Sequence, residues 1–288
     1  MTGPLPDLGQ HVERMLAIAR DRHHEFEEDC LTDPGRLVDH WGHGGDLRIA
    51  YVDALDHGII GQDPTTVIDD VGTSDLSGLF TPALPPKRFN RIHVKYQEYE
   101  YTARRNFTLL HEIGHYLQQT DDELVDAMCR FPSAYKEKRF EEAACNRFAS
   151  LALLPDDHIR SFLNAPTLHA ADIRDIFEHG RPRDRREGRK VRVSRPVVVR
   201  RMADFISVGQ TVSLIKNGKL EVRVHGDGTI DYDDALTAIE RHVVLNYKPK
   251  GPRKEMLQRV RRKDGSTVRF TAAGSYGRDV YYFVVLRH

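Results

Sequence analysis

The segment with the clearest chemical potential reads His111-Glu112-Ile113-Gly114-His115. On a helix, residues four positions apart lie on one face, so the two imidazoles point the same way. Imidazole nitrogens are ligands that Zn2+ accepts, and a glutamate beside the first histidine can serve as a general base. The motif therefore predicts half of a zinc hydrolase site, with His111 and His115 as metal ligands and Glu112 as the catalytic residue.

The residues around this motif have the spacing of an amphipathic helix. Phe107, Leu110, Ile113 and Leu117 are separated by three, three and four positions. Gly114 costs such a helix about 1 kcal/mol, and we expect it to allow the close approach of another backbone. The bare motif would occur by chance in about one such chain in twenty. The alternative to a metal site is a surface helix with two solvated histidines, and the neighbouring elements must decide between the two.

A second helix is predicted over 140–154, where small residues are frequent and Pro155 ends the pattern. A catalytic zinc needs three protein ligands and one open position for water. Glu142 can supply the third ligand, and Asn146, one turn later, can hydrogen-bond a ligand histidine. Glu141 is the alternative ligand, because the choice between neighbouring glutamates rests on pattern alone. Without the neighbouring motif, Glu141 and Glu142 would be interpreted as an ordinary charged face of a helix.

Three segments together resemble the ImmA/IrrE family of metallopeptidases. They are Arg104 to Leu117, Glu142-x-x-x-Asn146-x-Phe148-Ala149 followed by Leu153-Leu154-Pro155, and the stretch from Val193 to Met202. The chain departs from the family pattern at four positions, Leu110, Ala144, Cys145 and Leu154, which leave the outer glutamate in place. The resemblance is closest over about 91–155, weaker over 156–215, and weak or absent beyond.

This resemblance implies a cytoplasmic endopeptidase that uses Zn2+. Relatives often cleave a DNA-binding repressor and so switch on a stress, phage-related or mobile-element programme. The resemblance therefore implies a protein substrate of the repressor class. It also implies a helix-turn-helix-like region behind the catalytic helices.

Length and composition set further bounds. A chain of 288 residues suits one large domain or two ordinary ones. We see no basic-then-apolar leader, and the apolar runs are far too short for a membrane span. The three cysteines, Cys30, Cys129 and Cys145, form no Cys-x-x-Cys pair. We therefore expect reduced thiols in a cytoplasmic protein without a membrane partner.

The zero net charge conceals a split between the two halves. Residues 1–150 carry 16 basic and 26 acidic residues, whereas residues 151–288 carry 27 and 17. The segment 181–201 holds ten of these basic residues, and Lys248 to Lys263 is a second basic stretch. A nucleic-acid-binding regulator is therefore the competing hypothesis. A solvated loop is the favoured explanation of the charge. A third hypothesis, an inactive fold used for protein contact, conflicts with the intact Glu112.

Coarse patterns predict the remaining elements. We expect an amphipathic helix over 8–30, strands and loops over 44–85, helix over 156–180, and a further helix near 194–207. The alternating strand 91–96 is predicted to pair with an extended substrate. Its His93 is a possible fourth metal contact, although a half-exposed strand histidine is favoured. Asn217-Gly218 and Asp227-Gly228 are hairpin signals, and 220–224 and 280–286 read as strands.

The predicted fold class is α+β. We expect a zincin-like catalytic domain over 1–155, with a small strand region and two active-site helices. A helical, helix-turn-helix-like region with a basic loop follows over 156–210, and a β-rich accessory domain over 211–288. The group that polarises the substrate carbonyl beside the metal is left open among Tyr116, Tyr135 and His158.

Overall fold

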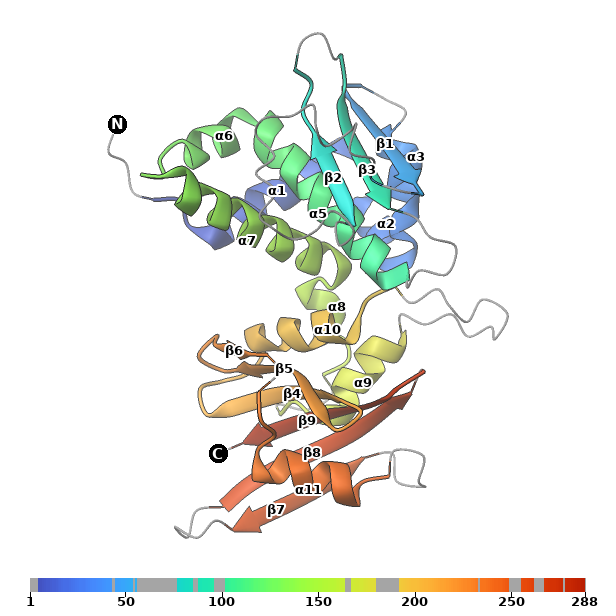
Figure 1. Ribbon diagram of the computed structural model, residues 1–288, viewed down its shortest axis with the longest axis vertical. Coiled ribbons are helices and arrows are strands. Elements are labelled where there is room, and N and C mark those ends of the chain that lie inside the picture. Colours follow the sequence, from blue (N-terminus) through green and yellow to red (C-terminus); the bar gives the residue numbers. More distant parts are fainter. Residues whose placement is uncertain are drawn as a thin grey trace. The chain divides into compact units, whose positions relative to one another are not determined.

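The computed structural model describes residues 5–42, 45–53, 55, 77–84, 88–95, 102–163, 167–179, 192–232, 234–248, 255–261, 267–276 and 278–287. The fold is mixed α+β, as predicted (Figure 1). The chain divides into two compact units. The first unit is Met1–Leu153 with Asp184–Arg192, and the second is Leu154–Arg183 with Val193–His288. The three-region division made from the sequence stays a prediction.

The first unit contains helices around a small sheet. Its helices are α1 (Leu8–Arg22), α2 (Phe26–Thr32), the 3-10 turn η1 (Pro34–Arg36), α3 (Leu37–Gly42), α5 (Thr102–Thr120), α6 (Asp122–Met128) and α7 (Ala134–Leu153). The single helix predicted over 8–30 is in fact two helices. The backbone of His23 turns to an extended conformation, with φ −144° and ψ 105°, and ends α1 there.

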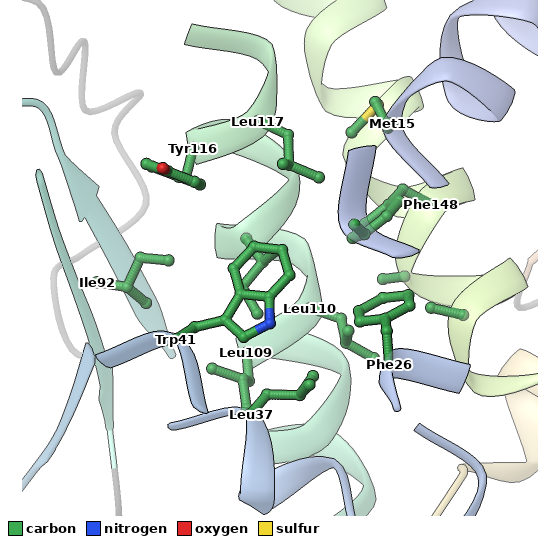
Figure 2. Close-up of a cluster of buried hydrophobic side chains, with 14 of the residues drawn as sticks. Met15, Phe26, Leu37, Trp41, Ile92, Leu109, Leu110, Tyr116, Leu117 and Phe148 are labelled. Atoms are coloured by element: carbon green, nitrogen blue, oxygen red, sulfur yellow. The ribbon is translucent and has the colours of Figure 1, made fainter. Parts of the chain in front are cut away.

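Helix α5 occupies the core of this unit (Figure 2). Its buried residues Leu109, Leu110 and Leu117 are at most 1 % exposed. They belong to one hydrophobic cluster with Phe148 of α7 and Ile92 of the sheet. Burial of each such side chain contributes about 1.5–3 kcal/mol, so this packing fixes the helix that carries the motif.

The sheet of the first unit has the strand order β1-β3-β2, with β1 at Leu47–Val52, β2 at Gly78–Thr81 and β3 at Asn90–Lys95. Strand β3 pairs in parallel with β1 and antiparallel with β2. The prediction that the strand at 91–96 pairs with substrate is therefore wrong, because both edges of β3 are occupied. Within the described residues, β2 is the edge strand that lies beside α5.

The second unit is built on a six-stranded sheet with the order β6-β5-β4-β9-β8-β7. The strands are β4 (Gln210–Lys216), β5 (Lys219–His225), β6 (Ile230–Asp231), β7 (Met256–Arg261), β8 (Thr267–Tyr276) and β9 (Val280–Arg287). Its helices are α8 (Asp156–Arg160), α9 (Ala170–His179), α10 (Arg195–Arg201), the 3-10 turn η3 (Met202–Asp204) and α11 (Ala238–Asn246). The hairpin predicted at Asn217-Gly218 is confirmed, since both residues have positive φ and join β4 to β5.

Helices cover both faces of this sheet. Phe177 of α9 packs on Phe283, whereas Val243 of α11 shares a cluster with Val284. Adjacent strand residues point to opposite faces, so α9 and α11 lie on opposite sides. Helix α11 differs from the strands that we predict for all of the chain after residue 211. Its signal is the capping box between Thr237 and Glu240.

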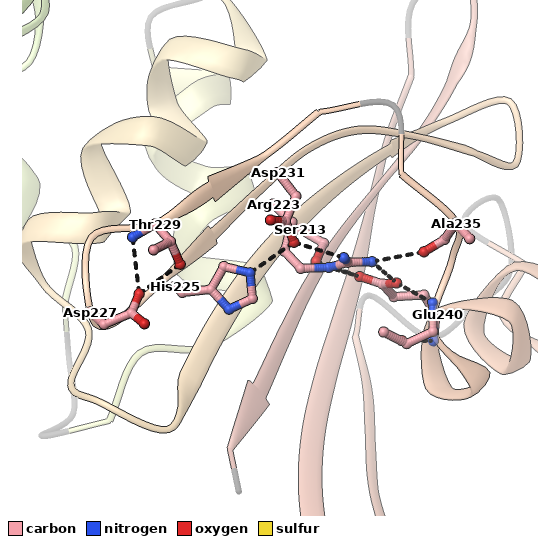
Figure 3. A network of polar contacts seen from close by, with 9 residues as sticks. Ser213, Arg223, His225, Asp227, Thr229, Asp231, Ala235 and Glu240 are labelled. Carbon is pink, nitrogen blue, oxygen red and sulfur yellow. Dashed lines mark hydrogen bonds and ion pairs between the residues drawn. The ribbon is translucent and has the colours of Figure 1, made fainter.

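A buried ion pair joins α11 to the sheet (Figure 3). The Arg223 guanidinium donates from Nε to Glu240 Oε1 at 3.0 Å and from Nη2 to Oε2 at 2.6 Å. Its Nη1 donates to Asp231 Oδ2 at 3.0 Å, and the Ser213 hydroxyl donates to Glu240 Oε1 at 2.5 Å. Glu240 is fully buried, so this network satisfies a charge that would otherwise destabilise the unit.

Candidate metal centre and active site

Gly114 brings helices α5 and α7 into close contact. A Cβ atom at this position would lie 3.1 Å from the Cys145 Sγ and 3.2 Å from the Cys145 Cα. The predicted use of this glycine, close approach of another backbone, is confirmed. This approach places Glu141 and Glu142 of α7 beside the histidines of α5.

Three donor atoms converge at the junction of the two helices. His111 Nε2 and His115 Nε2 lie 3.1 Å apart. The Glu142 carboxylate places Oε2 at 3.4 Å from His111 Nε2 and Oε1 at 3.7 Å from His115 Nε2. Ligand atoms roughly 2.0–2.1 Å from a tetrahedral zinc stand about 3.3–3.4 Å from one another. The observed separations of these donors therefore fit a single metal ion.

Glu141 holds the opposite nitrogen of one histidine. Its Oε1 lies 2.9 Å from His115 Nδ1 and also accepts a hydrogen bond from the Gln119 amide at 3.2 Å. A carboxylate on the far nitrogen fixes the tautomer and ring orientation of a ligand histidine. Of the two neighbouring glutamates, Glu142 faces the converging nitrogens and Glu141 lies behind His115.

The orienting role predicted for Asn146 has no counterpart among the hydrogen bonds of the described residues. Its backbone carbonyl accepts from the Ser150 hydroxyl, and no bond joins its side chain to either histidine. His111 Nδ1 is buried and has no hydrogen-bond partner in the described part of the chain. Asn146 as the partner of that nitrogen stays a prediction.

Cys145 offers an alternative third donor, because its Sγ and the two histidines have ligand atoms within 4.8 Å of one another. We favour Glu142 on two grounds. The thiol is fully buried and accepts a hydrogen bond from the Gln118 amide at 3.0 Å. Burial raises the pKa of Cys145 to about 11, so this thiol would have to release a tightly held proton to bind a metal. The Glu142 side chain is 44 % exposed, so its side of the site admits water.

Glu112 lies against the edge strand β2. Its carboxylate accepts a hydrogen bond from the backbone N–H of Phe80. A Cβ atom at Gly78 would stand only 2.7 Å from Glu112 Oε1. Burial raises the pKa of Glu112, and the neighbouring His115 and His111 only partly oppose this shift. A carboxyl with a raised pKa is suited to accept and return a proton near neutral pH.

Gly78 and Phe80 are site residues that the sequence analysis missed. The only signal was a short apolar run inside a segment predicted as strands and loops. A single strand of four residues gives too short a pattern to place it beside a particular helix.

Neither tyrosine proposed from the sequence to polarise the carbonyl is seen beside the donor atoms in the described part of the chain. The Tyr116 hydroxyl is bonded to Asp46 at 2.9 Å and to Arg22. Tyr135 is 70 % exposed in the first turn of α7, two turns before Glu142. His158 belongs to the second unit, and its role as the polarising group stays a prediction.

His93 is a strand residue and not a fourth metal contact. It lies between Ile92 and Val94, whose side chains are buried in the core that contains α5. By strand alternation its ring lies on the opposite face of the sheet. The alternative favoured from the sequence, a half-exposed strand histidine, agrees with this position.

Three arginines of the basic segment 181–201 are buried. Arg192 donates to the Leu153 carbonyl, Arg195 to Ser275 at 3.1 Å, and Arg201 to Asp156 at 2.5 Å. Each is at most 6 % exposed. These cations stabilise the two units internally, and nothing in the described residues supports a nucleic-acid interface. Residues 181–190 lie outside the described residues, and so do residues 249–254, 262 and 263 of the second basic stretch.

Residues 62–201, 140 of the 288, match the Peptidase_M78 family model, described as IrrE N-terminal-like domain. This part of the chain is therefore similar to an IrrE N-terminal-like domain. The ImmA/IrrE resemblance inferred from the sequence is thereby confirmed, and the matched range includes the whole of β2, α5 and α7. The matched range thus contains every residue of the candidate site.

A solved structure titled Mycobacterium tuberculosis transcriptional regulator is similar at 12 % sequence identity. The alignment covers 98 % of this chain and 94 % of that chain, with a TM-score of 0.46. No curated protein matches the chain. No helix among the described residues is long and apolar enough to cross a membrane.

Proposed function

We propose that the chain is a zinc-dependent endopeptidase that hydrolyses peptide bonds in a protein substrate. The observation that carries the proposal is the convergence of His111 Nε2, His115 Nε2 and the Glu142 carboxylate within 3.1–3.7 Å of one another. The peptidase family of the domain supports the same reading.

Zinc is the metal that this donor set suits best. Two imidazoles and one carboxylate, with one side open to water, are the ligands of a catalytic zinc. When bound, zinc would lower the pKa of a water molecule toward 7 and polarise the substrate carbonyl. Glu141 would hold the His115 ring in place from its far nitrogen.

Glu112 is the proton carrier of the proposed reaction. Its carboxylate is next to both histidines and is held by the Phe80 N–H. It would accept a proton from the attacking water and deliver it to the amine of the departing peptide. Because β2 and the core bury it, Glu112 is shielded from bulk water.

Strand β2 would bind the substrate backbone. The Lys95 N–H donates to the Ser77 carbonyl. The backbone N–H and C=O groups of residues 77, 79 and 81 therefore point toward β3, and those of residues 78 and 80 point away from β3. The outward position of Phe80 agrees with its bond to Glu112. An extended peptide pairing with the outward groups at Gly78 would lie directly beside the metal ligands, with affinity from main-chain hydrogen bonds.

The substrate class follows from the family resemblance. We expect a DNA-binding regulatory protein of the repressor type, cleaved in the cytoplasm. An extended segment between two folded parts of such a regulator would fit an open strand edge better than a folded surface does.

Expression of the wild-type chain and of the Glu112→Gln variant in one host tests the proposal. New protein N-termini should appear with the wild type and fall by about 10²–10⁴-fold in rate with the variant, since general acid–base catalysis contributes that much. Zinc content should be unchanged. Equal cleavage by both proteins would show that Glu112 is not the base, and absence of any new N-terminus would contradict the peptidase proposal.

A further inference from the structure

A second group of metal-binding side chains lies in the first unit, at the corner between α1, α2 and α3. His23 Nε2 is 2.8 Å from Asp29 Oδ2, and His40 Nε2 is 3.7 Å from the same oxygen. The two imidazoles stack at 4.5 Å with 23° between their planes. Together with the Glu25 carboxylate, these side chains place four donor atoms within 4.8 Å of one another.

Asp29 is the centre of this group. It is 1 % exposed although it is charged. Its Oδ1 faces the Arg36 guanidinium at 3.6 Å, whereas Oδ2 is shared by the two imidazoles. A metal-ligating carboxylate commonly has its second oxygen engaged by another group, as Arg36 does here.

The separations suit a tetrahedral ion. Donors bound to one zinc at roughly 2.0–2.1 Å stand about 3.3–3.4 Å apart, and the two nitrogen–oxygen distances lie on either side of that value. Two imidazoles exclude the hard cations Mg2+ and Ca2+ as preferred occupants and favour Zn2+. Four protein ligands would close the coordination sphere, which is typical of a structural site.

We infer that His23, Glu25, Asp29 and His40 form a second, structural zinc site. It shares no ligand with the centre at His111 and His115. The ion would link the end of α1 and the whole of α2 to α3. The neighbouring residue of α3, Trp41, is 2 % exposed in the core, so the site would fix the helix that inserts this side chain.

Metal analysis of variants tests the inference. Protein loaded with excess zinc and freed of unbound metal should hold about two zinc ions per chain. The His111→Ala/His115→Ala variant should hold about one, and so should the His23→Gln/His40→Gln variant. The matched control is His24→Ala, because His24 is an exposed neighbour outside the group. This control should retain both ions.

A spectroscopic measurement keeps the test independent of folding defects in the variants at His23 and His40. Co2+ added to the His111→Ala/His115→Ala variant should give the intense visible absorption of a tetrahedral site. Absence of both zinc and this absorption in that variant would overturn the inference and leave an ordinary ion-pair cluster. A wild-type chain that binds zinc at His23 and His40 but not at His111 and His115 would instead contradict the proposed peptidase and leave this inference standing. The two failures are therefore distinguishable.

Discussion

At the scale of single residues, neighbouring glutamates have different positions around one histidine. Glu142 lies on the Nε2 side of His111 and His115, and Glu141 bonds the Nδ1 of His115. The side chain of Glu141 is 20 % exposed and that of Glu142 is 44 % exposed. One carboxylate is therefore placed to bind a metal beside water, and the other to orient its ligand.

Glutamine substitutions separate these two roles. Glu142→Gln should abolish stoichiometric zinc binding at this centre, because a ligand is lost. Glu141→Gln should keep the metal but weaken its affinity or the activity by about 10–100-fold. Competition titration with a zinc chelator measures both. If Glu141→Gln has the larger effect on affinity, the ligand assignment is reversed.

Gly78 provides a second prediction at residue scale. Gly78→Ala should reduce kcat by about 10²-fold, because the new methyl group overlaps Glu112 Oε1 and displaces the base. Zinc content should stay at the wild-type value. Leu79→Ala is the control, since residue 79 points to the other face of β2. A Gly78→Ala enzyme with normal kcat would show that Glu112 has room to move.

At the scale of elements, the pairing of α5 with α7 creates the site. The two helices are in contact where Gly114 meets the backbone of Cys145. Helix α5 supplies the histidines and the base, and α7 supplies both glutamates. Strand β2 closes the other side of Glu112. In proteins most helix stability comes from the packing of an apolar face, so the shared core positions the chemistry.

Gly114→Ala tests this packing. The added Cβ would meet the Cys145 Cα at 3.2 Å, and forcing the helices apart should destabilise the first unit by about 1–3 kcal/mol. Urea unfolding measures the change. Gly9→Ala in α1 is the matched control, because its Cβ would meet only the Asp7 carboxylate, at 3.1 Å. That variant should be neutral or slightly stabilised; an equal loss in both would contradict the packing argument.

Much of this arrangement was predictable from the sequence. Apolar residues three and four positions apart, together with the spacing of His111 and His115, predicted α5. Gly114 indicated a close helix contact. The role of β2 was not predictable, because strand order depends on pairings between distant segments that no local pattern records. The sequence also could not separate Glu141 from Glu142, which differ by a rotation of one residue on α7.

At the scale of the whole molecule, the chain has two compact units with separate cores. The peptidase residues lie in the first unit, and the Arg223–Glu240 pair lies in the second. The helix α11 that carries Glu240 was missed because its nine residues follow a strand-rich pattern. Substitutions in one unit should leave the chemistry of the other intact.

Glu240→Gln tests the second unit through its pH dependence. Burial alone would raise the pKa of Glu240, but hydrogen bonds from Arg223 and Ser213 lower it below the ordinary 4.5. A lowered folded-state pKa stabilises the protein above that value, and this stability is lost as the pH falls below it. At pH 7 the variant should be about 3–5 kcal/mol less stable, since Arg223 loses the fully buried one of its two carboxylate partners and keeps only Asp231.

The stability difference between wild type and Glu240→Gln should narrow as the pH falls below about 4.5, because the unfolded wild-type chain takes up a proton there while the folded carboxylate, with its lowered pKa, still holds its charge. Urea unfolding of both proteins at pH 7 and pH 4 measures this stability difference. A difference that is constant with pH would show that the charge of Glu240 contributes nothing. Zinc content at His111 and His115 should be the same in both proteins.

Anomalous diffraction at the zinc absorption edge, from crystals of the zinc-loaded chain, tests the proposed metal centre most directly. The account predicts a peak about 2.0–2.2 Å from His111 Nε2, His115 Nε2 and a Glu142 carboxylate oxygen. A peak bonded to Cys145 Sγ or to Glu141 in place of Glu142 would contradict the ligand assignment. Zinc-loaded crystals with no peak between the two histidines would contradict the peptidase mechanism itself.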